Sequence, residues 1–214
     1  ALFLIIQICR YWYADTLYLS GSNYNKTNRQ DLALPYLTKA VKIEPKQAFY
    51  YSELSKSYTG LALAYQEAKQ STTAAQLTEA AIESSIKSIE LSPANVNLKR
   101  IEFGVFLMLA GLDQNYLLDA RDVLISAIKQ APTDAKLFYN LGLIYTRLGQ
   151  NDLALETLKK TVDLRSNYRD ARLAYAVLLI DAGRKDEART QLEYILQNIS
   201  PDDSQTRQYL ESIQ

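Results

Sequence analysis

Apolar and small residues recur along most of this chain at spacings of three and four positions, which is the period of amphipathic helices. The pattern is clearest over residues 135–166, where the apolar positions fall on two successive helices: Leu141 and Tyr145, then Ala154 and Leu158. Gly149 lies between them and supplies a turn. No segment alternates apolar and polar residues as a strand does. The pattern therefore predicts an all-α chain of antiparallel helix pairs.

The paired pattern repeats with a period of about 34 residues and resembles the tetratricopeptide repeat. Leu141-Gly142, Tyr145 and Ala154 stand at the offsets typical of that repeat, whereas Thr161 replaces a usual Ala and Ser166 replaces a usual Pro. The resemblance implies a right-handed α-solenoid with an extended concave surface.

The repeat pattern predicts about five units and a final capping helix, eleven helices in all. The units are expected at residues 14–47, 48–94, 95–134, 135–168 and 169–200, with the capping helix at 201–214. Pro45 and Pro93 are 48 positions apart, so the second unit should contain an elongated helix pair. Ser200 is expected to cap the last helix, with Pro201 at its first position.

The first nine residues, ALFLIIQIC, differ from the rest because they are apolar on every side except Gln7. The run is far shorter than the ~20 residues that span a bilayer. Arg10 and the aromatic residues at 11–13 are nevertheless typical of a membrane–water boundary. We therefore predict that residues 1–13 end a transmembrane or apolar anchoring helix, and that the protein is bacterial and membrane-associated. The alternative is a soluble homo-oligomer, in which this helix is buried against a second copy.

Composition excludes several classes of function. The chain has 24 basic and 24 acidic residues, which gives no electrostatic argument for binding nucleic acid. It has no His and one Cys, Cys9, which excludes His-based catalysis and multi-Cys zinc sites. No phosphate-binding, hydrolase or metal-binding motif is present. We predict that this chain is not an enzyme and holds neither cofactor nor metal.

The predicted binding surface is the concave one, which the first helix of each repeat lines. Two positions per repeat should point inward, and they are Tyr18, Ser22, Ser52, Lys56, Ile101, Val105, Tyr139, Leu143, Leu173 and Val177. Lys56 alone matches the Lys, Asn and Arg set with which related repeats hold a carboxylate. From the third repeat onward these positions are apolar, so they suit an apolar or amphipathic protein segment. The alternative is that superhelical curvature buries them.

The whole chain is also similar to the C-terminal tails of bacterial membrane proteins of the O-antigen ligase/polymerase family. The similarity rests on the apolar start with residues 10–15, and on the segments NRQDLALPYLTKAVKIEP, APTDAKLFYNLGLIYTRLGQ, NYRDA and QLEYILQNISPDD. It implies an accessory role beside a membrane glycan transferase whose catalytic residues lie outside this chain. We predict a non-catalytic scaffold for protein–protein contact next to a membrane, with this accessory role as an alternative.

Overall fold

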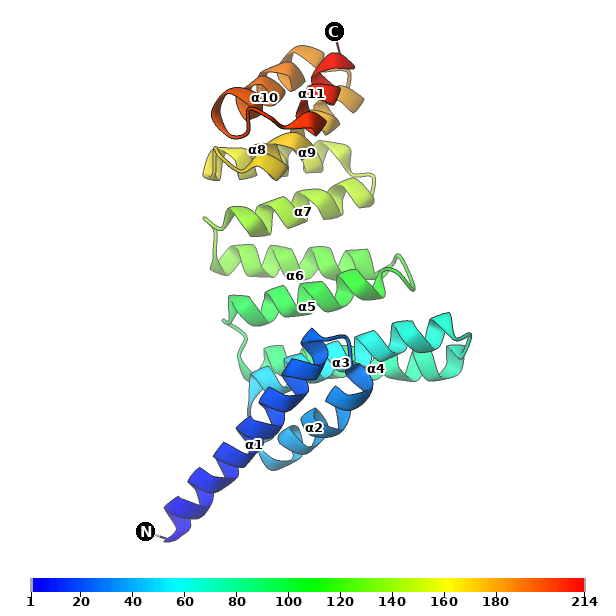
Figure 1. Cartoon of the computed structure of the whole chain (residues 1–214), viewed down its shortest axis with the longest axis vertical. Coiled ribbons are helices and arrows are strands. Elements are labelled where there is room, and N and C mark those ends of the chain that lie inside the picture. Colours follow the sequence, from blue (N-terminus) through cyan, green and yellow to red (C-terminus); the bar gives the residue numbers. More distant parts are fainter. Residues whose placement is uncertain (1, 214) are drawn as a thin grey trace. The chain divides into compact units, whose positions relative to one another are not determined.

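The computed structural model describes residues 2–213, and this part of the chain is all-helical, without strands (Figure 1). Its eleven helices are α1 (Leu2–Lys26), α2 (Gln30–Ile43), α3 (Ala48–Glu67), α4 (Ser71–Leu91), α5 (Val96–Leu109), α6 (Tyr116–Gln130), α7 (Ala135–Arg147), α8 (Asn151–Leu164), α9 (Arg169–Asp181), α10 (Lys185–Asn198) and α11 (Ser204–Glu211). The predicted all-α class and the eleven helices are confirmed. The helices form two compact units that divide between Val123 and Leu124, within α6.

A glycine packed against a leucine lets the two helices of a pair approach closely. A Cβ atom at Gly142 of α7 would lie 2.7 Å from Leu158 Cγ of α8. A Cβ atom at Gly21 of α1 would lie 2.5 Å from Leu37 Cγ of α2. Both leucines are fully buried. The leucine side chain therefore occupies the space that any other residue type would fill at the glycine position.

The turns between helices follow the chemistry of the local sequence. Gly149 and Gly183 have φ values of 70° and 74°, a left-handed conformation that glycine adopts without strain. Asn95 caps α5 by accepting hydrogen bonds from the N–H groups of the second and third helical residues. The cap of α11 is Asp203 and not Ser200, because the Asp203 carboxylate accepts the Thr206 N–H at 3.1 Å. Pro201 accordingly lies in the preceding turn.

The apolar start of the chain is the exposed first half of α1, which continues without a break into the first repeat. Leu2, Phe3 and Trp12 are 73%, 70% and 68% exposed, and in Figure 1 this end extends beyond α2. Within residues 2–213, no helix has the length and apolar character needed to cross a bilayer. This finding overturns the predicted membrane-associated localisation.

Two local features explain why the membrane interpretation of α1 failed. Within the described residues, the apolar positions of α1 give way to the polar and small positions of a repeat helix, including Asp15 and Ser20, so α1 as described is not apolar over bilayer length. The Arg10 side chain, which suggested a membrane boundary, binds within the fold instead. Its Nε lies 2.6 Å from Oε1 of Glu44, a carboxylate that is almost completely buried.

The second helix pair is elongated. Helices α3 and α4 contain 20 and 21 residues, compared with 14 for α5 and 13 for α7. The pair extends past the neighbouring α5 in Figure 1. Ala62 of α3, together with Ala74 and Ala81 of α4, is buried. Small side chains therefore allow the two long helices to pack closely.

Candidate functional site: a groove on the second unit

The inward positions predicted for the first two repeats are largely buried. Tyr18 of α1 stacks on Tyr50 of α3, with ring centroids 5.0 Å apart. Ser22 and Ser52 are 6% and 2% exposed, and Ser52 donates a hydrogen bond to the Phe49 carbonyl at 2.9 Å. The Tyr18–Tyr50 contact packs α1 against α3, and Ser22 and Ser52 are too deeply buried to line an open surface.

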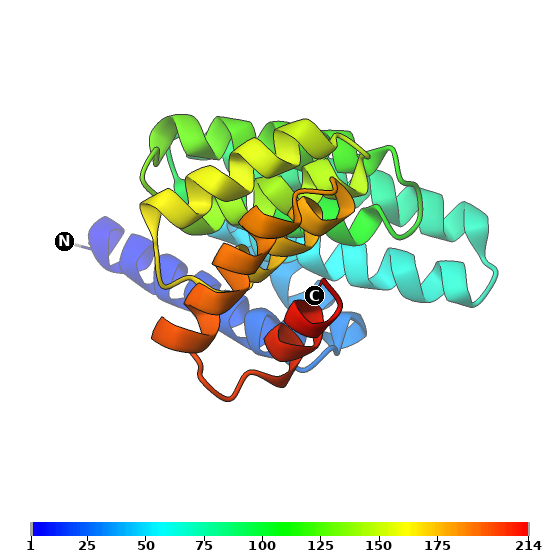
Figure 2. The same ribbon diagram turned by 90° about the horizontal axis from the view of Figure 1, so that it is seen from above.

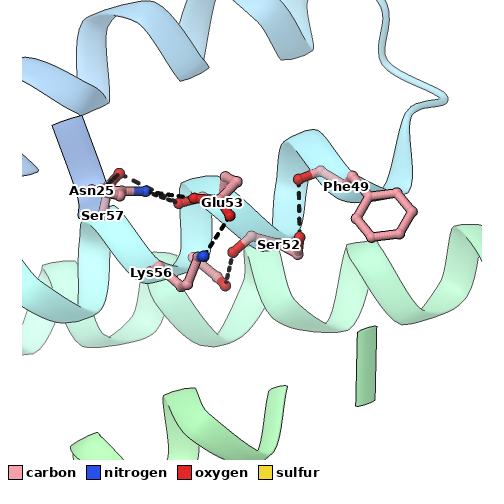
Figure 3. A network of polar contacts seen from close by, with 7 residues as sticks. Asn25, Phe49, Ser52, Glu53, Lys56 and Ser57 are labelled. Atoms are coloured by element: carbon pink, nitrogen blue, oxygen red, sulfur yellow. Dashed lines mark hydrogen bonds and ion pairs between the residues drawn. The ribbon is translucent and has the colours of Figure 1, made fainter. Parts of the chain in front are cut away.

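Lys56 belongs to a polar network that joins α1 to α3 (Figure 3). Its ammonium group forms an ion pair with the carboxylate of Glu53, which is buried. The Asn25 amide donates to the backbone carbonyl of Glu53 at 2.9 Å and to its carboxylate at 3.0 Å. Ser57 donates to the Asn25 side-chain oxygen at 2.8 Å. The one basic residue among the predicted positions is therefore already paired within the fold.

The two positions predicted on the third repeat lie in α5, where Val105 is buried and Ile101 is half-buried. The neighbouring Glu102 is also half-buried. Burial raises the pKa of its carboxyl group to about 7, and the nearby Lys99 opposes this shift. The folded protein therefore binds a proton at Glu102 over a pH range in which the unfolded chain has lost it.

This shift predicts that Glu102 makes the fold less stable as the pH rises from about 4.5 to about 7. The sign follows because the folded state binds more protons than the unfolded state in this window. The free energy of unfolding of Glu102→Gln should be higher than the parent's at pH 8 by roughly 1–2 kcal/mol. This value allows for the exposed part of the side chain, where solvent weakens the effect of burial on the pKa. Urea unfolding at pH 5 and pH 8 measures the difference. Glu83→Gln, at an exposed position of α4, is the control. An unchanged pH dependence in Glu102→Gln would contradict the burial argument.

In the second unit, the predicted inward positions come together in one groove. Tyr139 and Leu143 of α7 face Leu173 and Val177 of α9 across a cavity of about 360 Å³. Leu173 is buried, and the other three are half-buried. The first helices of successive repeats thus combine their apolar side chains on one surface, and its volume lies within the range of ligand sites, about 300–1,000 Å³.

Helix α9 contributes a stripe of residues along the whole length of this groove. The stripe follows the three- and four-residue spacing of a helix face and consists of Asp170, Leu173, Ala174, Val177, Leu178 and Asp181. Its centre is apolar, and a carboxylate lies at each end. The two acidic residues were not among the predicted positions, although both lie on the same helical face as those that were.

Helix α11 forms the third side of the groove, which the sequence did not predict. Gln205 and Tyr209, one turn apart, line the cavity. Figure 2 shows α11 (red) beside α10 (orange). The apolar residues of this short helix suggested a cap that only covers the end of the array. Ile213, just after α11, is indeed buried in the core, but Tyr209 also faces the groove.

Arg169 holds α11 in place through two charge-assisted hydrogen bonds. Its Nε and Nη2 donate to the two carboxylate oxygens of Asp203 at 2.6 and 2.9 Å. Nη2 also donates to the Gln205 side chain, and Nη1 donates to Asp170, both at 3.0 Å. Hydrogen bonding to Arg169 holds the pKa of Asp203 well below its usual range, against the opposing effect of burial. The same hydrogen bond raises the pKa of Arg169.

The Tyr139 phenol adds a hydrogen-bonding group to an otherwise apolar surface. Burial raises its pKa, and the nearby Asp170 carboxylate raises it further. The hydroxyl therefore stays protonated at neutral pH and can donate a hydrogen bond. The ring packs against Tyr168, with centroids 5.0 Å apart, which fixes its position at the edge of the groove.

The elongated pair carries a separate cavity of about 520 Å³ on the first unit. It lies between the outer turns of α4 and the connection from α5 to α6, and its lining includes Glu79, Glu83 and Asp113 beside Ile82 and Tyr116. The sequence predicted the elongation but not this cavity.

Within residues 2–213, no cluster of His, Cys, Asp and Glu could hold a metal ion.

Comparison with known protein families identifies the repeats. Models described as tetratricopeptide repeat match residues 14–47, 124–156 and 147–205. The last two ranges include the groove helices α7 and α9. A curated relative, the DnaJ homolog subfamily C member 3 of Bos taurus, is 28% identical over 100 residues. The match covers 47% of this chain and 19% of the relative, so the chain spans about a fifth of that protein's length.

Solved structures show the same fold at low sequence identity. MamA from Desulfovibrio magneticus RS-1 has a TM-score of 0.66 at 19% identity, covering 90% of this chain and 98% of the other. TTC0263, a thermophilic TPR protein of Thermus thermophilus, has a TM-score of 0.57 at 24% sequence identity, and the match covers 94% of this chain and 98% of the other. YrrB, a TPR protein with an unusual peptide-binding site, has a TM-score of 0.61 at 16% sequence identity, and the match covers 89% of this chain and 88% of the other. These matches support the repeats and the solenoid, and they give no support to the resemblance to O-antigen ligase/polymerase tails.

Proposed function

We propose that this chain, which is built of tetratricopeptide repeats, is a non-catalytic scaffold that binds a segment of a partner protein in the groove between α7, α9 and α11. The proposed ligand is an amphipathic helix, whose apolar side chains would cover Tyr139, Leu143 and Val177.

One observation carries this proposal. Residues from three helices that are far apart in the sequence place half-buried apolar side chains around a single cavity, and the two carboxylates of the α9 stripe lie at its ends. An apolar centre with a polar rim is the composition of a protein–protein contact. The peptide-binding site of YrrB is a property of that protein, and it gives a precedent for a peptide ligand on this fold.

The groove should bind a neutral amphipathic peptide, and single charges placed in the groove should abolish this binding. A suitable probe is an N-acetylated, C-amidated helical peptide with Leu on one face and Ala and Gln elsewhere, labelled with fluorescein. We expect saturable binding by fluorescence anisotropy, and a loss of at least tenfold in affinity for Leu143→Glu and for Val177→Glu. A buried glutamate without a partner charge is costly, whereas the same residue is tolerated in the free, solvated groove.

The matched control is Leu153→Glu, because Leu153 of α8 is a 44% exposed apolar residue of the same unit that does not line the groove. It should bind the peptide as the parent does. Equal affinity of parent, Val177→Glu and Leu153→Glu would show that the peptide binds elsewhere and would refute the proposed site.

A further inference from the structure

We infer that the segment bound in this groove carries a basic side chain at each end of its apolar stripe, which Asp170 and Asp181 select. The inference rests on the proposed function, and it adds the chemical class of the ligand. The two carboxylates lie at opposite ends of the α9 stripe, and both line the cavity with exposed side chains.

The charge around the groove is negative. Asp170, Asp181 and the clamped Asp203 contribute three carboxylates, and Arg169 contributes one guanidinium group. Arg169 is held by Asp203, with Gln205 and Asp170 as further acceptors, so its charge is already balanced within the fold. Within residues 2–213, Asp181 has no ion-pair partner. A ligand cation would supply the missing counter-charge.

Two other basic side chains of this end of the chain are engaged elsewhere. Arg184, three residues beyond Asp181, donates to both carboxylate oxygens of Glu187 at 2.6 and 2.7 Å. Arg207 of α11 donates to the Pro201 carbonyl at 2.6 Å and contacts Asp202. Neither arginine lines the groove. Within the described lining of the groove, the basic residue is Arg169, which already has carboxylate partners. The carboxylates of the groove would therefore repel an acidic ligand, which disfavours it.

The spacing of the two carboxylates sets the length of the ligand. Asp170 and Asp181 are 11 positions apart on one helix, which corresponds to roughly 16 Å along the helix axis. A helical ligand spans that distance in three turns, and its intervening Leu residues would lie over the apolar centre of the groove. Arginine residues 11 positions apart would then lie close to one carboxylate each.

Three versions of the probe peptide test this inference. They share the Leu face and carry two Arg, two Gln or two Glu residues, 11 positions apart on that face. We expect the Arg peptide to bind the parent at least fivefold more tightly than the Gln peptide in 50 mM NaCl, and the Glu peptide to bind most weakly. The advantage of the Arg peptide should shrink in 500 mM NaCl, because salt screens exposed charges.

The double variant Asp170→Asn/Asp181→Asn should bind the Arg and Gln peptides equally. The matched control, Asp152→Asn/Asp186→Asn, makes the same change in net charge at exposed positions of α8 and α10 and should retain the parent's preference. Equal binding of the Arg and Gln peptides by the parent, with both abolished by Val177→Glu, would overturn the inference and leave the proposed function standing. Failure of all three peptides to bind the parent would refute the proposed function itself.

Discussion

Replacing Gly142 with Leu should disrupt the second unit, because no space exists for a side chain at this position. The Cβ atom alone would lie 2.7 and 2.8 Å from Leu158 Cγ and Cδ2, and Leu158 is fully buried. The two helices would have to separate, which removes buried apolar contacts between α7 and α8. We expect a loss of about 3 kcal/mol in the free energy of unfolding. This corresponds to a fall of roughly 15 °C in the melting temperature for a unit of this size. Thermal unfolding followed by circular dichroism measures it.

Gly104 provides the matched control for this substitution. It occupies the corresponding glycine position of the third repeat, in α5, but a Cβ atom there would have nothing within 4 Å. Gly104→Ala should therefore raise stability by roughly 0.5–1 kcal/mol through higher helix propensity. Gly142→Ala should lower it, because its Cβ meets the Leu158 side chain. Equal changes in stability from the two alanine substitutions would show that close packing against Leu158 is not the reason for a glycine at position 142.

The helix pairs could be predicted from sequence because their determinants are local. The Gly142 and Leu158 pair, like the Gly21 and Leu37 pair, is separated by sixteen positions, so one repeat contains both partners. The start of α11 was predicted less well. Ser200 and Asp203 are both good cap residues, and only the observed hydrogen bond to Thr206 distinguishes them.

The binding surface could be predicted only in part, because its shape depends on contacts between repeats. The same offsets that place Leu143 and Val177 in a groove place Ser52 in the interior and Lys56 in an ion pair. Lys56 is paired by Glu53, which lies one turn away in α3, whereas the burial around Ser52 involves the preceding repeat, where Tyr18 packs on Tyr50. The role of Tyr209 was missed for a similar reason, since Arg169, which holds α11, lies in an earlier helix.

Removing the Arg169 guanidinium should release α11 from the groove. In Arg169→Met, the Asp203 carboxylate, only 7% exposed, would lose both of its hydrogen bonds to Arg169. Leaving a buried carboxylate without its partner is costly, and we expect a loss of about 2–3 kcal/mol in the stability of α11 docking. Amide hydrogen exchange should rise in residues 204–211 and remain near the parent's level in α7. The neutral peptide should also bind less tightly, because Tyr209 would leave the groove wall.

The dependence on pH and a second substitution separate this mechanism from a general loss of packing. Because Arg169 lowers the pKa of Asp203, the pair stabilises the fold fully above the unfolded pKa of about 3.9 and progressively less as the pH falls below it. Arg169→Met should lose this acid sensitivity. Asp203→Asn keeps a side chain able to cap α11, so the double variant Arg169→Met/Asp203→Asn should be more stable than Arg169→Met alone. A double variant no more stable than Arg169→Met would show that the unpaired carboxylate is not the cause.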